Sequence, residues 1–239
     1  MRVPGAAVIA AEARAHAGRP LSLRSSLLVP CGLGLALLVV WPRATIAAVM
    51  RIGPSPNPFD VVAVCLVLLA VYLGARHGSE DYDPGSAVRL RDLVRFTPVS
   101  LAEIVLGKAA FGVVHTAFLL LLGAPFVVAS LAVGGAGGAE AVRVLAVTGA
   151  ACLCARMLGL LVLVVVRGRA LVRDVVLFTI LALAIVLALL FLPMASPIDA
   201  VVARTPRQTG ISAGISLTVA LALAVTAAFA MRILRRPDA

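Results

Sequence analysis

Charged side chains are scarce in this sequence. They make up 13% of its 239 residues, whereas hydrophobic residues make up 62%. Soluble domains contain about 25% charged and about 45–50% apolar residues. A folded chain of this size still exposes much of its surface, so it cannot hide that apolar excess from water. The composition therefore excludes a soluble enzyme and a disordered tail, and it predicts a protein that lies in a lipid bilayer.

Cysteine is also rare. The four cysteines, Cys31, Cys65, Cys152 and Cys154, all lie in apolar runs, where cysteine behaves as a small hydrophobic residue. Cys152 and Cys154 are two positions apart, so they would not share a helix face. The sequence therefore predicts neither a disulfide scaffold nor a metal site.

Motifs for catalysis are missing as well. The chain has three histidines, and it contains no H-E-x-x-H motif, no Gly-x-Ser-x-Gly motif and no acidic cluster within an apolar run. An intramembrane hydrolase or a lipid transferase needs nucleophiles or carboxylates that converge near the bilayer. We therefore predict no catalytic residues and no enzymatic activity for this chain.

What the sequence does contain is long apolar runs. A helix needs about 20 apolar residues to cross a bilayer, with about 17–25 tolerated. The runs that qualify are Ser25–Trp41, Phe59–Ala75, Ala109–Val133, Val142–Val166, Asp174–Pro193 and Ile211–Met231. None of them alternates between apolar and polar residues as a barrel strand does. The predicted fold class is all-α: a polytopic membrane protein with six transmembrane helices in residues 25–231.

The basic residues predict which side of the membrane each connection faces. Fifteen of the 21 Lys and Arg residues lie in the N-terminal segment 1–24, in the connections after the second and fourth runs, and in the tail 232–239. Lys and Arg are enriched in cytoplasmic loops, so both termini are predicted to be cytoplasmic. This distribution also explains the net charge of +10 without a nucleic-acid partner.

The connections on the opposite side carry few charges. Residues 42–58 include Pro54, Pro56 and Pro58 and are predicted to be extended. Residues 194–210 have room for a short helix at most.

The inner segment 76–108 is the most patterned part of the chain. Its turn-forming residues 80–85 should end the second membrane helix. Between Ser86 and Phe96, apolar residues follow a helical spacing and charged residues occupy the remaining surface. The apolar residues are Leu90, Leu93 and Val94, and the charged ones are Arg89, Arg91, Asp92 and Arg95. This pattern predicts a short amphipathic helix at the inner face of the membrane.

A break and a new helix start follow this amphipathic segment. Pro98 disfavours helical backbone at Thr97. Ser100 and Glu103 then form an S-x-x-E capping box, which marks the start of a helix. That helix is predicted to continue past residues 107–108 into the third apolar run.

Residues 93–108, Leu-Val-Arg-Phe-Thr-Pro-Val-Ser-Leu-Ala-Glu-Ile-Val-Leu-Gly-Lys, resemble the signature of the permeases of type-2 ABC exporters. That signature has an acidic residue and a glycine in a turn, a Leu-rich stretch, Thr-Pro-Val-Ser, a Glu shortly after, and a final Gly-Lys. Glu80 and Gly85 match the turn, although Pro84 is a less usual neighbour there. The layout of six runs with cytoplasmic termini also resembles this family.

The resemblance implies a function in transport. In this family the short helix, here residues 86–97, is a coupling helix that sits in a groove of a separate cytoplasmic ATPase and passes its movement to the membrane helices. The residues that the resemblance assigns to this coupling are Glu80, Gly85, Arg89, Asp92, Arg95, Thr97, Pro98, Glu103, Gly107 and Lys108. It also implies an interfacial elbow helix at Ala6–Leu21, a second permease subunit in a homodimer or heterodimer, and a place in the bacterial cytoplasmic (inner) membrane.

The chain lacks the loop needed to hydrolyse ATP. A Walker A loop reads G-x-x-x-x-G-K-[ST], but the only Gly-Lys, at 107–108, is flanked by Ala102 and Ala109 at the positions that need Gly and Ser or Thr. ATP and Mg²⁺ are therefore expected on the partner ATPase, and no cofactor is expected in this chain.

Two polar residues within the apolar runs are candidates for the transport pathway. Arg156 lies near the middle of the fourth run, where a charge costs at least about 2.5–3.5 kcal/mol. In one interpretation it meets an anionic or polar group of the substrate. In the other it is structural, and it either bonds to backbone carbonyls or reaches toward the membrane surface. His115, in the inner third of the third run, makes either an interhelical hydrogen bond or a proton relay.

Two alternatives to an ABC exporter permease remain. One is the membrane subunit of the haem exporter of cytochrome c maturation, which the chain also resembles in its length and its short final outer loop. The other is a membrane scaffold without transport activity, whose cytoplasmic helix docks another partner.

Overall fold

The computed structural model describes residues 8–10, 13, 25–50, 57–80, 100–166, 170–203 and 205–234. All regular structure in these residues is helical. The helices are α3 (Leu28–Met50), α4 (Pro58–Ser79), α6 (Leu101–Gly134), α7 (Gly138–Val165), α8 (Ala170–Phe191), α9 (Pro197–Ala203) and α10 (Pro206–Leu234). The prediction of an all-α protein is confirmed for these parts of the chain.

Five of the described helices are long and apolar enough to cross a membrane. They are α4, α6, α7, α10 and the part of α8 from Leu171 to Phe191. These five helices lie at the second to sixth predicted runs. The first predicted run falls in α3, where the apolar stretch Leu28–Trp41 is shorter than the other five. The chain thus has the build of a multi-pass membrane protein.

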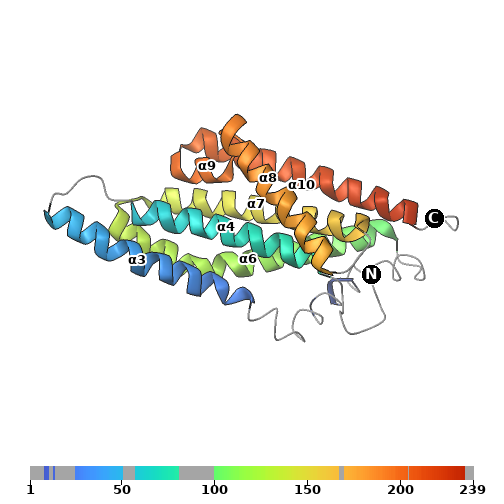
Figure 1. Cartoon of the computed structure of the whole chain (residues 1–239), viewed down its shortest axis with the longest axis horizontal. Coiled ribbons are helices and arrows are strands. Elements are labelled where there is room, and N and C mark those ends of the chain that lie inside the picture. Colours follow the sequence, from blue (N-terminus) through green and yellow to red (C-terminus); the bar gives the residue numbers. More distant parts are fainter. Residues whose placement is uncertain are drawn as a thin grey trace.

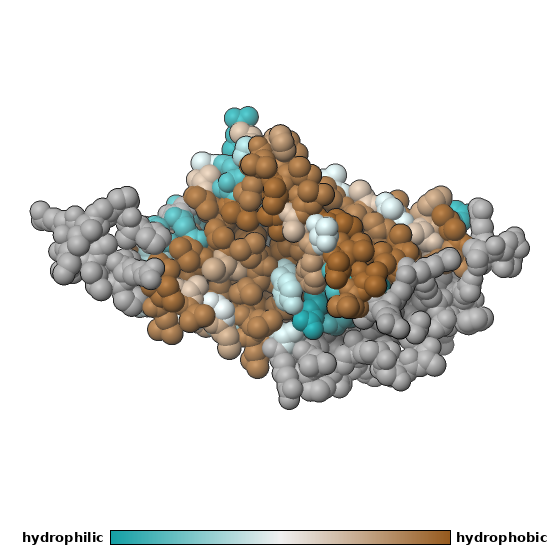
Figure 2. Space-filling view, viewed as in Figure 1, coloured by the Kyte–Doolittle hydropathy of each residue, from teal (hydrophilic) through white to brown (hydrophobic). Residues whose placement is uncertain are grey.

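The outer surface of these helices is apolar. Figure 2 shows hydrophobic residues over most of the described surface in view. Large exposed apolar side chains occur on every long helix, among them Leu38, Val114, Val142, Leu190 and Leu221. A water-soluble monomer rarely exposes an apolar surface of this extent, so the surface suits the interior of a bilayer.

Helices α4 and α7 form the centre of the bundle. Figure 1 shows them side by side, with α3 and α6 along one side and α8, α9 and α10 along the other. The larger hydrophobic core lies mainly between α3, α4, α6 and α7. A second core joins α6, α7 and α10 around Ile104, Leu160 and Met231, and Val8 packs into it. Of the predicted elbow helix at 6–21, residues 8–10 and 13 are described and are helical; the rest lies outside the described residues.

Glycines allow α4 and α7 to pack backbone against backbone. A Cβ added to Gly74 would lie 2.6 Å from the carbonyl oxygen of Cys152. One turn further along both helices, a Cβ on Gly78 would overlap the carbonyl oxygen of Arg156. On α7, a Cβ on Gly159 would likewise overlap the backbone of α4. The contacts advance in the same direction along both helices, so α4 and α7 run parallel. Small residues four apart are the usual means of such close approach between membrane helices.

Asn57 ties the start of α4 to the end of α6. Its side chain accepts a hydrogen bond of 3.0 Å from the backbone N–H of Phe59, which caps α4, and donates one of 3.1 Å to the carbonyl oxygen of Gly134. Helix α6 ends there because Gly135 adopts a left-handed conformation with φ of 66°, which glycine adopts without steric cost. These two ends are thereby held together.

The outer connections 42–58 and 194–210 agree with the predictions in part. The expectation of extended backbone over 42–58 is wrong in its first half, because α3 continues to Met50. Residues 43–50 contain neither proline nor glycine, and the closely spaced prolines begin only at Pro54. The short helix allowed in 194–210 is present as α9.

Candidate functional site

The predicted ATPase-coupling residues fall into two groups. The helix expected at 86–97 lies outside the described residues, as do Gly85, Arg89, Asp92, Arg95, Thr97 and Pro98. The other four residues, Glu80, Glu103, Gly107 and Lys108, are described. They lie at the C-cap of α4 or in the first eight residues of α6, the two helices that flank residues 81–99.

Helix α6 begins at the predicted capping box. The Oγ of Ser100 accepts a hydrogen bond of 3.2 Å from the backbone N–H of Glu103, and the carboxylate of Glu103 accepts one of 3.0 Å from the N–H of Ser100. The helix then runs for 34 residues, or about 50 Å at 1.5 Å per residue. The hydrocarbon core of a bilayer is about 30 Å thick, so α6 is long enough to project well out of it. The predicted helix start and the continuation past 107–108 are confirmed.

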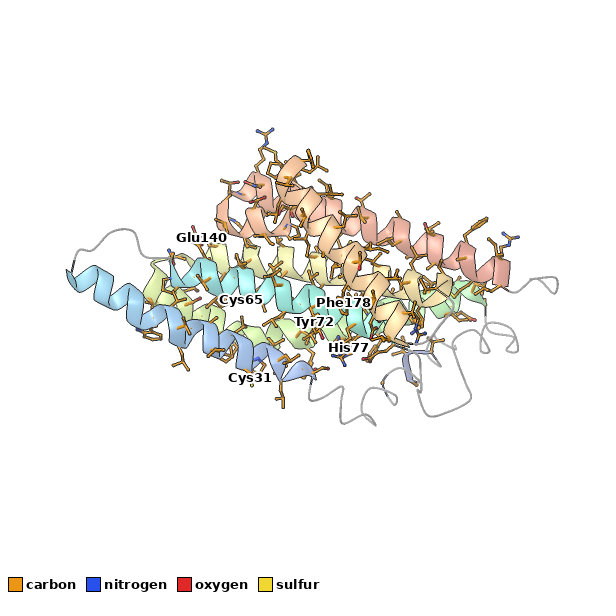
Figure 3. All side chains as sticks on the ribbon, viewed as in Figure 1. Cys31, Cys65, Tyr72, His77, Glu140 and Phe178 are labelled. Atoms are coloured by element: carbon orange, nitrogen blue, oxygen red, sulfur yellow. The ribbon has the colours of Figure 1, made fainter. Side chains whose placement is uncertain are left out.

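Helix α4 ends where the turn residues begin, with Glu80 as its C-cap. The carboxylate of Glu80 lies 3.7 Å from Nε of Arg76, and Arg76 also donates a hydrogen bond of 3.1 Å to the hydroxyl of Tyr72. The Tyr72 ring stacks on Phe178 of α8 with 5.2 Å between centroids. Figure 3 shows these two rings close together near the C-terminal end of α4.

Gly107 and Lys108 lie on the buried face of α6. Lys108, which the resemblance assigns to the coupling surface, is only 5% exposed. It shares this face with Ile104, Phe111 and His115, because residues three, four and seven apart lie on one side of a helix. The side chain of Lys108 therefore belongs to the interior of the bundle in this structure.

The two candidate pathway residues, Arg156 and His115, are in contact. The Nη1 atom of Arg156 on α7 lies 3.2 Å from Nδ1 of His115 on α6. The guanidinium also lies over the ring of Phe111, with its carbon 5.3 Å from the centroid, in a cation–π arrangement. Gly112 makes space for it, since a Cβ there would lie 2.8 Å from Cδ of Arg156. Arg156 and His115 are 4% and 3% exposed.

Arg156 lies level with the C-terminal end of α4. Its backbone packs against Gly78, which is in the last turn of α4. Helix α7 extends about two and a half turns beyond this level, to Val165. The two parallel helices therefore end at different levels.

His77 completes the arrangement and was missed by the sequence analysis. Its ring centroid lies 4.6 Å from that of His115. Its Nδ1 lies 2.7 Å from the carbonyl oxygen of Leu73, and its Nε2 lies 3.3 Å from Oγ of Ser25, just before α3. We call Ser25, His77, Phe111, His115 and Arg156 the His–Arg cluster. It joins α3, α4, α6 and α7 at the end of the bundle where α4 ends, and Figure 3 labels His77 there.

One sequence signal could have located this cluster. Residues 74–78 read Gly-Ala-Arg-His-Gly, which is a G-x-x-x-G motif in an apolar helix, typical of a tight helix–helix contact. His77 lies inside that motif and next to Gly78, so the motif indicates that this part of α4 faces another helix. It does not indicate which helix.

The cluster combines two imidazoles, which exchange protons, with one guanidinium, which can bind an anion. A guanidinium only donates hydrogen bonds, whereas imidazoles donate or accept according to their protonation. Nearby, Thr116 donates a hydrogen bond of 3.4 Å to Sγ of Cys152, which links α6 to α7 again. Across the described part of the chain, no three His, Cys, Asp or Glu residues are grouped so that they could hold a metal ion.

Comparison with known proteins gives no relative. No protein-family model matches the chain, and no curated protein or solved structure matches it either. What the chain does has to be inferred from its own residues and their arrangement.

Proposed function

We propose that this chain is the membrane permease subunit of an ATP-driven ABC exporter and forms half of the translocation pathway. It would lie in the cytoplasmic membrane of a bacterium with both termini in the cytoplasm, as the distribution of Lys and Arg favours. The observation that carries the proposal is the resemblance of residues 80–108 to the type-2 exporter signature, together with the capped helix that begins within this segment at Leu101.

The geometry of α6 supports a mechanical role. A force applied to residues 86–97 reaches the membrane helices only if the connection between them is stiff. The connection runs through Ser100, whose reciprocal hydrogen bonds with Glu103 fix the start of α6. From there the backbone of α6 is helical to Gly134, and Pro125 is the proline inside it, so the stiff part runs from Ser100 through the first six turns. A partner that moves the 86–97 segment would therefore move α6 as a lever.

The energy for transport would come from a partner. The chain has no Walker A loop, so two copies of a separate ATPase would bind ATP and Mg²⁺ and act on the 86–97 segments. A bundle with the predicted six spans, the first formed by α3, supplies only half of a pathway. A second permease subunit, identical or related, completes it.

Arg156 and His115 keep their proposed place near the pathway. They are polar side chains in a bundle whose cores are apolar, and intramembrane charges of this kind commonly mark transport routes. In the proposed transport cycle, a movement of α6 would separate Arg156 from His115 and turn it toward a polar or anionic group of the substrate.

The test is first to look for a neighbouring reading frame that encodes a Walker-type ATPase, and then to express that ATPase with the full chain. We expect the two to co-purify from detergent-solubilised membranes, and the ATPase to hydrolyse ATP faster with the permease than alone. Reversing three charges of the predicted coupling helix in one variant, with Arg89→Glu, Asp92→Arg and Arg95→Glu, should abolish this stimulation without reducing membrane insertion.

The matched control is Arg235→Glu in the cytoplasmic tail, which changes the net charge by the same amount on the same predicted side. It should leave the stimulation unchanged. A chain that co-purifies with no ATPase, or whose triple variant stimulates ATP hydrolysis as well as the natural sequence does, would instead be the membrane scaffold considered above.

A further inference from the structure

Helix α8 is attached to the bundle at few positions. Of its described residues only Leu177 is buried, and large exposed apolar side chains occur along its whole length, among them Val175 and Leu190. Figure 1 shows α8 crossing α4 at an angle. The stack of Phe178 on Tyr72 joins the two helices near the start of α8. What fills the space between them farther along therefore decides how firmly the rest of α8 is held.

A groove lies between α8 and α4, about two to three helical turns beyond Phe178. It is lined by Val67, Leu68 and Val71 of α4, Ile185 and Ala188 of α8, and residues 196–198 at the start of α9. We call this space the α4–α8 groove. Its wall exposes apolar atoms only. The hydroxyl of Ser196 is buried and accepts a hydrogen bond of 3.2 Å from the N–H of Asp199.

The groove opens onto the surface that suits the bilayer. Leu68 in its wall is 42% exposed, whereas Val67 and Val71 are 2% and 8% exposed, so Leu68 lies at the mouth and the two valines form the floor. The 22 residues of α4 span about 33 Å at 1.5 Å per residue, close to the hydrocarbon thickness of about 30 Å. The floor residues lie in the middle of α4. The groove therefore lies near the middle of the bilayer, where the acyl chains of both leaflets end.

The groove is too small for a protein segment. Its cavity volume is about 30 Å³, and about 10–15 Å³ on the same measure holds one water molecule. A second helix, whose axis lies about 8–10 Å from that of its neighbour, does not enter such a space. A polar ligand finds no hydrogen-bond partner on an apolar wall, and a buried water needs about two to four polar partners. The end of a hydrocarbon chain is narrow enough and requires none.

We propose that the α4–α8 groove binds the methyl end of an acyl chain of a membrane phospholipid. The chain enters sideways past Leu68, because the groove is continuous with the bilayer-facing surface. Its end gives the walls dispersion contacts that an empty space of this size does not provide. Helix α8 is thus held on α4 by the stacked rings at one level and by lipid at the next. The proposal requires only that the bundle lie in a bilayer, so it can fail or succeed apart from the proposed partnership with an ATPase.

The test uses the full-length chain in phosphatidylcholine nanodiscs. A small share of the lipid carries a photoreactive diazirine at the methyl end of one acyl chain, and mass spectrometry locates the residues to which it attaches after irradiation. Because Val67 and Val71 are buried, a chain that stays on the surface does not reach them. We expect attachment at these two valines. The same lipid with the diazirine next to the ester carbonyl should not attach to them, since that end of the chain lies near the membrane surface.

Two variants of α8 separate a chain in the groove from general contact with lipid. Ala188→Phe fills the groove from the α8 side and should lose the attachment at Val67 and Val71. Ala184→Phe is the matched control, because Ala184 lies one turn earlier on α8, is exposed and is not part of the groove wall; it should keep the attachment. Unfolding in SDS checks that both variants fold. If Ala188→Phe is destabilised, the smaller Ala188→Leu should still lower the attachment.

Three results would overturn the proposal. The first is the absence of attachment at Val67 and Val71 in the natural sequence, and the second is attachment that persists unchanged when Ala188 is enlarged. The third concerns a second copy of the chain on this face. With the four native cysteines replaced by alanine, Leu68→Cys at the mouth of the groove should give no disulfide-linked dimer under oxidation. A linked dimer would mean that protein, and not lipid, covers the groove.

Discussion

Gly78 on α4 lies directly against the backbone carbonyl oxygen of Arg156 on α7, with no room for a side chain between them. Interhelical packing in membranes relies on such close approach, since lipid offers no hydrophobic drive for association. The contact also fixes the level of Arg156 along the bundle and leaves its side chain directed to α6, where it meets His115. One glycine on α4 thus positions a charge on α7 against a histidine on α6.

The first prediction concerns this contact. Gly78→Ala should destabilise the protein by about 1–3 kcal/mol, the usual cost of overpacking a tight interior. The added methyl would overlap the carbonyl oxygen of Arg156 and force α4 and α7 apart. Unfolding of the purified protein by SDS titration in mixed micelles measures the change. Gly214→Ala is the matched control, since Gly214 is also within a helix but has no atom within 4 Å of its added Cβ. An equal loss in both variants would contradict the prediction.

The start of α6 was predictable and the His–Arg cluster was not, for one physical reason. A capping box is local: Ser100 and Glu103 are three residues apart, so their side chains meet whenever a helix begins there. His77, His115 and Arg156 come from three helices, and the sequence does not say which faces of those helices meet. That depends on the depth and rotation at which α4 and α7 pack, which the glycine contacts set.

The second prediction is a coupling energy between Arg156 and His115. In a double-mutant cycle with Arg156→Met and His115→Leu, the effects should be non-additive by about 0.5–3 kcal/mol, as for residues in direct contact. Each single change leaves the partner's polar atoms buried without that bond, whereas the double change removes both. A control cycle pairs Arg156→Met with Asn57→Ala, because Asn57 lies at the opposite end of α4. That cycle should be additive within about 0.5 kcal/mol. Additivity in both cycles would mean that the 3.2 Å contact contributes nothing to stability.

The third prediction addresses the lever. Ser100→Ala should destabilise the first turn of α6 by about 1 kcal/mol, the typical cost of losing a cap. Amide hydrogen exchange at Ile104, whose N–H donates to the carbonyl oxygen of Ser100, should accelerate by about fivefold, since 1.4 kcal/mol corresponds to a factor of ten. Ser100→Asp keeps an acceptor for the N–H of Glu103 and should exchange like the natural sequence. If the alanine variant exchanges no faster, the capping box does not stabilise the start of α6.

The first apolar run shows that the end of an apolar run does not give the end of the helix. Apolar length alone predicted a span at Ser25–Trp41, and a helix does form there. That helix continues to Met50 through residues that were expected to be extended. It passes Pro42 and Arg43, where a helix-breaking residue and the fall in hydropathy both favour an end. Hydropathy therefore locates the run but does not set the end of the helix.

The last prediction concerns how α8 is held on the bundle. Most of its large apolar side chains are exposed, but Leu177 is fully buried, and the neighbouring Phe178 stacks on Tyr72 of α4. Phe178→Leu keeps an apolar side chain but removes the stacked ring, and should weaken the attachment by about 0.5–1.5 kcal/mol. A spin label at the exposed Leu183 should then become more mobile in nanodiscs. Tyr72→Phe keeps the stacked ring and loses only the hydrogen bond from Arg76, so the label should move little more than in the natural sequence. Equal mobility in the two variants would mean that the stacked rings do not hold α8 against α4.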